Sequence, residues 1–105
     1  MHLILSPIET ERKLNWDNAI EYCENLTING YTDWKLPSLY ELGQLVHEYP
    51  LEFNKDDYWT RTERWYESPG AHFINCESPD IFQSCWKEHK LLVRAVRKAT
   101  CEICK

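Results

Sequence analysis

The sequence predicts an α+β domain in which two helices pack on a small antiparallel sheet with long irregular loops. Two segments with apolar residues at helical spacing come first, and segments rich in strand-forming residues follow in the second half. The chain of 105 residues has room for one domain with one core. Five Trp, six Tyr and three Phe supply large side chains for that core. We therefore expect a single domain over residues 1–98, followed by a tail at 99–105.

The first predicted helix covers residues 15–28, after a short strand at residues 2–5. Its apolar residues lie at helical spacing and form one stripe: Trp16, Ala19, Ile20, Cys23 and Leu26. Polar and acidic residues fill the opposite face. Gly30 follows directly and is predicted to end this helix in a left-handed conformation.

The second predicted helix begins at Ser38, because Ser38 and Glu41 have the spacing of a capping box. Pro37 precedes the helix, where it costs no helical hydrogen bond, and Pro50 ends the pattern. The apolar stripe is Leu39, Leu42, Val46 and Tyr49. The segment from Asp33 to Pro37 then joins the two helices, and we expect its role to be structural.

Three strands are predicted in the second half from their content of β-branched and aromatic residues: 58–62, 72–76 and 91–97. Residues 68–70 (Ser-Pro-Gly) indicate a turn between the first two. Residues 77–90 are polar and are predicted to be irregular.

Arg94 and Arg97 are three residues apart, so in one strand they would project to opposite sides. We expect one of them to form an internal ion pair, with Asp33 or Glu41 as its partner. The other is expected to be exposed in a basic strip that consists of Lys87, Lys90 and Lys98.

The net charge of −5 is unevenly distributed and argues against a nucleic-acid-binding protein. Residues 1–60 carry 4 basic and 11 acidic side chains, whereas residues 61–105 carry 8 basic and 6 acidic ones, which leaves room for a local anionic partner. No apolar run is long enough for a membrane span, and the first residues do not form a secretory signal. The expected location is the cytoplasm.

Several segments together resemble the Lcl C-terminal domain family, named after the C-terminal domain of the Legionella collagen-like adhesin. They run in order from about residue 14 to 98: Trp16-x-x-Ala19-x-x-Tyr22-Cys23-x-x-Leu26, Gly30-Tyr31-Thr32-Asp33-Trp34-Lys35-Leu36-Pro37-Ser38-x-x-Glu41-Leu42, Tyr58-Trp59-Thr60 and Val93-Arg94-Ala95-Val96-Arg97. The resemblance implies a C-type-lectin-like fold. This fold is related to the formylglycine-generating enzymes and to many non-enzymatic modules, and one member of the family is an adhesin domain that binds sulfated polysaccharides.

The five cysteines offer a possible metal site. Cys101-Glu102-Ile103-Cys104 is a C-x-x-C sequence, and together with Cys76 and Cys85 it would give four thiolate ligands for zinc, with His72 or His89 as replacements. The spacing of Cys76 and Cys85 does not match a zinc knuckle, and a single C-x-x-C is a weak signal. Free thiols without a cofactor are therefore the preferred interpretation, and a zinc-stabilised or redox protein is an alternative.

No catalytic motif is found, so we expect a binding function rather than an enzyme. Aromatic and basic residues in two polar segments are the candidate partner-binding residues: Arg64, Trp65, Tyr66, Trp86, Lys87 and His89. The alternative is that Trp65 and Trp86 fold back and plug the loops in which they lie. The preferred function is a stand-alone lectin-like module that binds another protein, for example as a phage or mobile-element inhibitor of a host factor. A sulfated-glycan-binding module is a further alternative.

Overall fold

The computed structural model describes residues 3–81 and 83–99, and its architecture is α+β, as predicted. The elements in chain order are β1 (Leu3–Leu5), η1 (Ile8–Thr10), β2 (Arg12–Leu14), α1 (Trp16–Glu24), α2 (Leu39–Glu48), η2 (Pro50–Glu52), β3 (Asp57–Glu63), β4 (Gly70–Asn75), β5 (Gln83–Trp86), β6 (Leu91–Val93) and β7 (Val96–Lys98). None of the helices in these two ranges has the length and hydropathy to span a membrane.

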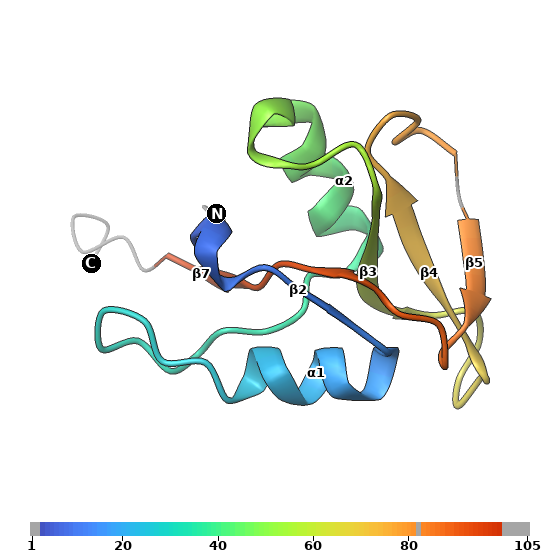
Figure 1. The fold of residues 1–105 in the computed structure, drawn as a ribbon, viewed down its shortest axis with the longest axis horizontal. Helices are drawn as coiled ribbons and strands as arrows, with labels where there is room; N and C mark the ends of the chain where they lie inside the picture. Colours follow the sequence, from blue (N-terminus) through green and yellow to red (C-terminus); the bar gives the residue numbers. More distant parts are fainter. Residues whose placement is uncertain (1–2, 82, 100–105) are drawn as a thin grey trace.

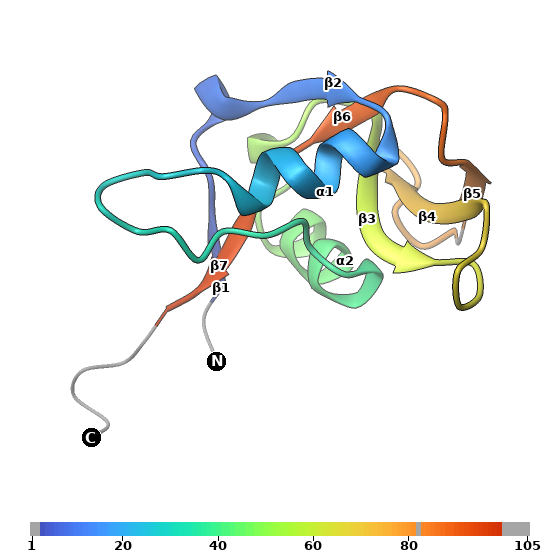
Figure 2. The same cartoon turned by 90° about the horizontal axis from the view of Figure 1, so that it is seen from below.

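Five strands form the main sheet in the order β2-β6-β3-β4-β5 (Figure 1). Its pairs are antiparallel except β3–β6, which is parallel. The predicted sheet was antiparallel, whereas the observed sheet is mixed. The first and last strands, β1 and β7, lie side by side and form a separate two-stranded antiparallel sheet (Figure 2).

The two helices cover opposite faces of the main sheet, as Figure 1 shows with α1 below the strands and α2 above them. Side chains alternate along a strand, and β3 follows this rule. Trp59 packs in the core cluster with α1, whereas its neighbour Tyr58 packs in the cluster with α2. On β4, Phe73 and Ile74 divide between the same two clusters. The domain therefore has two cores that share one sheet.

The capping box of α2 is present as predicted. The Ser38 side chain accepts a hydrogen bond from the Glu41 backbone N–H at 3.1 Å, and the Glu41 carboxylate accepts one from the Ser38 N–H at 2.9 Å. Burial alone would raise the pKa of Glu41, but hydrogen bonds from Ser38 and Arg61 outweigh it and hold the pKa below its ordinary value. This cap fixes the N-terminus of α2 next to β3.

The first helix is shorter than predicted, and Gly30 does not cap it. Helix α1 ends at Glu24, and Gly30 lies in a two-residue turn with Asn29, where both residues have positive φ (82° and 53°). Ile28 and Tyr31 exchange two backbone hydrogen bonds across this turn, at 3.0 and 3.1 Å. Asn-Gly favours this turn type, and this local signal explains the difference.

The predicted strand at 91–97 is two strands, β6 and β7, in different sheets. The chain leaves the main sheet at Arg94 and Ala95. Ser6 holds this break in place, because its N–H donates to the Ala95 carbonyl at 2.9 Å and its Oγ accepts from the Ala95 N–H at 3.1 Å. The segment 77–90, predicted to be irregular, also contains a strand, β5, and the strand β2 was not predicted.

The predicted ion pair between Arg97 and Asp33 is confirmed, at 2.7 Å between Nε and Oδ1. The hydrogen bond from Arg97 holds the pKa of Asp33 below its ordinary value. The prediction that the other arginine is exposed is wrong, because Arg94 is only 2% exposed. Its guanidinium binds the backbone oxygens of Ser6 and Glu52 and lies 3.7 Å from the Glu11 carboxylate. The break between β6 and β7 makes room for both arginines inside the domain.

Candidate binding site

An irregularity in β3 positions the candidate site. The register between β3 and β4 shifts between Trp59 and Glu63, and there the Thr60 hydroxyl donates to the His72 carbonyl at 2.8 Å. Such a bulge bends a strand and redirects its side chains. The Thr62 hydroxyl accepts from the Leu39 N–H at 2.9 Å, so the bulge also joins β3 to the start of α2.

The turn that follows brings two tryptophans to one arginine. Trp86 lies at the end of β5, directly opposite Gly70 of β4. The Arg64 guanidinium lies 5.4 Å from the Trp65 ring centroid and 5.5 Å from that of Trp86, within the range of cation–π attraction. A hydrogen bond of 3.2 Å from its Nε to the Ser84 hydroxyl fixes it further.

Gly70 makes this arrangement possible. A Cβ at this position would lie 3.0 Å from the Arg64 guanidinium carbon and one of its nitrogens, which is closer than ordinary van der Waals contact. The Arg64 N–H donates to the Gly70 carbonyl at 3.0 Å, so the arginine begins next to the glycine and then lies over it. A side chain here would force the guanidinium of Arg64 to shift by a few tenths of an ångström.

The aromatic side chains here are exposed. Trp65 is 55% exposed, Trp86 50% and Tyr66 85%, so the two indoles do not fill the core. We call Arg64, Trp65, Tyr66 and Trp86 the aromatic surface. Side chains of this kind are enriched among the residues that dominate binding energies in protein interfaces.

Two predicted site residues lie apart from this group. The Lys87 ammonium forms an ion pair of 2.7 Å with Glu63 and lies 4.1 Å from the Trp16 ring centroid, which holds its side chain against the domain. His89 is exposed and follows Trp86 in a turn, where its N–H donates to the Trp86 carbonyl at 3.1 Å. In the described part of the chain, no hydrogen bond or cation–π contact joins its ring to Arg64 or Trp65.

The proposed zinc ligands are only partly described. Cys101 and Cys104 lie outside the described residues, whereas Cys76 and Cys85 are half-buried free thiols. Burial, together with nearby carboxylates, raises the pKa of Cys76 to about 12, and burial also raises the pKa of Cys85. Within residues 3–81 and 83–99, no three His, Cys, Asp or Glu side chains are grouped so as to hold a metal ion.

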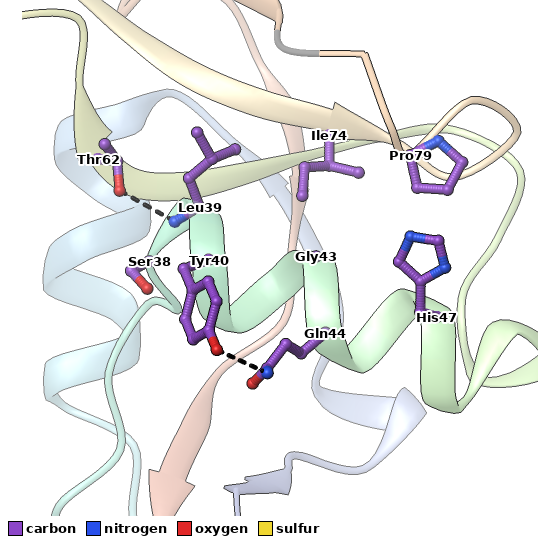
Figure 3. A pocket seen from close by; sticks show the side chains of 9 residues that line it. All are labelled: Ser38, Leu39, Tyr40, Gly43, Gln44, His47, Thr62, Ile74 and Pro79. Atoms are coloured by element: carbon purple, nitrogen blue, oxygen red, sulfur yellow. Dashed lines mark hydrogen bonds between the residues drawn. The ribbon is translucent and has the colours of Figure 1, made fainter.

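The structure also shows a cavity of about 530 Å³ that the sequence analysis did not predict. It lies along α2 and is lined by residues of α2, β3 and β4 and of the segment after β4 (Figure 3). The only signal for it in the sequence is Gly43, a glycine inside a helical pattern, because the other lining residues are ordinary for a helix or a strand.

Residues 5–97 match the model of the family described as the Lcl C-terminal domain. The chain belongs to the Lcl C-terminal domain family. The match extends from β1 into β7 and so includes both sheets, both helices and the aromatic surface. No curated protein matches the chain. Membership of this family is compatible with a non-catalytic binding module, while the C-type-lectin-like relationship stays a prediction.

Proposed function

We propose that this Lcl C-terminal domain is a non-catalytic binding module that recognises a protein partner in the cytoplasm through the aromatic surface. One observation carries the proposal: Arg64 holds two exposed indoles, one from the connection between β3 and β4 and one from the end of β5, in one group. Exposed aromatic groups of this size are not needed for the core, because Trp34 and Trp59 already occupy it.

The fixed arrangement favours affinity. Binding costs conformational entropy for every side chain that must be ordered, about 0.5–1.5 kcal/mol for a side chain with many rotamers. The contacts of Arg64 with Trp65, Trp86 and Ser84 already order this arginine before a partner arrives. The surface therefore offers large apolar area and a guanidinium at a reduced entropic cost.

The test is affinity capture from a lysate of the native host cell with three baits. These are the wild-type domain, a Trp65→Ala/Tyr66→Ala variant, and a Leu51→Ala control. Leu51 is 97% exposed in η2, so its replacement removes exposed apolar surface at a separate place. We expect one protein to be enriched by the wild type and the control and lost with the double variant.

The captured protein is then purified and titrated by calorimetry. If Trp65 and Tyr66 dominate the interface, the double variant binds at least about 30-fold more weakly, which corresponds to about 2 kcal/mol. Equal affinities for the wild type and the double variant would refute the proposed surface. Retention on a heparin column at about 0.15 M salt, together with no captured protein, would instead support the sulfated-glycan function.

A Gly70→Ala variant tests the fixed arrangement itself. It deletes no contact atom of the surface, but its Cβ would lie 3.0 Å from the Arg64 guanidinium, which must then shift by a few tenths of an ångström. We expect weaker binding with little loss of folding stability, because the end of the arginine side chain can move away. Unchanged affinity would show that a shift of this size in Arg64 does not affect binding.

A further inference from the structure

The cavity along α2 shares no residue with the aromatic surface. Its floor lies between the helix backbone at Gly43 and the side chain of Ile74 from β4. Figure 3 shows Thr62 near one end, and His47 with Pro79 at the other. These residues mark the two ends of the site along the helix.

Its lining is mostly apolar. Among the lining residues, all of which the structure describes, there is no Lys, Arg, Asp or Glu. The polar groups near it are already hydrogen-bonded to protein: the Tyr40 hydroxyl accepts from the Gln44 amide at 2.9 Å, and His47 Nε2 lies 2.8 Å from the Asp80 carboxylate. The Tyr40 hydroxyl hydrogen and the Gln44 carbonyl oxygen have no partner among the described residues and lie at the edge of the cavity.

Gly43 points to a binding role because the fold gives no other reason for it. It lies inside α2, where glycine destabilises a helix relative to alanine, and its φ is not positive. A Cβ there would meet only Ile74 Cδ1, at an ordinary 3.8 Å. Neither backbone conformation nor packing therefore requires glycine, and its effect is to keep the floor of the cavity open.

We propose that the α2 cavity binds a small, uncharged, mostly apolar molecule. A volume of about 530 Å³ falls within the range of small-molecule sites, about 300–1,000 Å³. A charged ligand would lose its hydration without gaining an opposite charge from the lining. Tyr40 and Gln44 offer one donor and one acceptor to orient it. The proposal is independent of the aromatic surface.

The probe is N-phenyl-1-naphthylamine, a neutral molecule with a phenyl and a naphthyl group, and its fluorescence rises when it binds in an apolar site. It is titrated into the wild type, a Gly43→Leu variant and a Trp65→Ala control. Leucine is a better helix former than glycine, and its side chain fills the floor of the cavity. We expect saturable one-to-one binding to the wild type and the control, and an affinity at least about tenfold lower for Gly43→Leu.

Chemical-shift mapping on the wild type gives an independent result if the leucine variant changes the helix. The probe should shift the amide signals of Gly43, Thr62 and Ile74 and leave those of Trp65 and Trp86 unchanged. Three outcomes would overturn the proposal: no saturable binding, unchanged affinity of Gly43→Leu, or shifts confined to the aromatic surface. A loss of binding with Trp65→Ala alone would assign the probe to that surface instead.

Discussion

Replacing Arg94 with methionine should destabilise the domain more than any exposed substitution. Methionine keeps most of the aliphatic part of the side chain but removes the charge and all five N–H donors. In the native structure, Nε and Nη2 donate to the Ser6 carbonyl, and Nη1 donates to the Glu52 carbonyl at 2.8 Å. The Glu11 carboxylate lies 3.7 Å from Nη1 and would lose its buried cation.

The expected loss follows from these contacts. Leaving a buried acceptor unsatisfied costs about 1–3 kcal/mol, and breaking a buried ion pair costs about 3–5 kcal/mol. The terms overlap, and Glu11 retains hydrogen bonds from Tyr58 and from the Asn54 amide at 2.7 Å. We therefore expect a decrease of about 3–5 kcal/mol in the free energy of unfolding, out of about 5–15 kcal/mol for a typical domain.

Urea unfolding, followed by tryptophan fluorescence, measures the loss in the free energy of unfolding. In a separate thermal melt, the melting temperature should fall by at least about 12 °C, at about 4–8 °C per kcal/mol for a domain of this size. Arg12→Met is the matched control, because Arg12 is exposed although it also donates to two backbone oxygens. A loss below about 1 kcal/mol for Arg94→Met, or an equal loss for the control, would refute the role assigned to Arg94.

Three further predictions concern Glu41, two cysteines and Gly30. The pKa of Glu41 is lower in the folded state than its ordinary 4.5, so its contribution to stability is present above that value and is lost as the pH falls through the lowered pKa. Glu41→Gln should therefore be less stable at pH 7, with a weaker decrease in stability on acidification, and parallel pH profiles in urea titrations would contradict this. Burial raises the pKa of both Cys23 and Cys76 to about 12. Iodoacetamide should therefore modify both thiols slowly at pH 8 in the folded protein and quickly in urea, which mass spectrometry can follow. Fast modification of Cys23 in the folded protein would contradict its burial. Gly30→Ala forces a side chain into a positive φ of 82° and should cost about 1–2 kcal/mol, whereas unchanged urea stability would mean that the turn relaxes freely.

The helices could be predicted because their signals are local. The apolar stripe from Trp16 to Cys23 and the capping box at Ser38 each lie within a few residues, and the structure contains both helices. The division of 91–97 into two strands could not be predicted, since it depends on Ser6, far away in the sequence. The short strands β2 and β5 depend on pairing in the same way.

The aromatic surface was predictable in its residues but not in its geometry. The sequence shows that Trp65 and Trp86 lie in polar segments, and this pattern suits an exposed indole as well as one that fills a core. The pairing of β4 with β5 decides the matter, because it brings Trp86 opposite Gly70. Because Gly70 has no Cβ, the Arg64 guanidinium can lie over it and contact both Trp65 and Trp86, which are distant in sequence.

The distribution of charge in the folded domain favours a protein partner over a sulfated glycan. The second half of the chain has an excess of basic residues, which in the sequence alone suggests a site for anions. In the structure, carboxylates of the first half neutralise much of this excess: Arg61 pairs with Glu41, Arg94 with Glu11 and Arg97 with Asp33. Lys87 is paired with Glu63. Arg64 is in cation–π contact with the exposed indoles, and one guanidinium is a small charge for a polyanion but a common anchor in a protein interface.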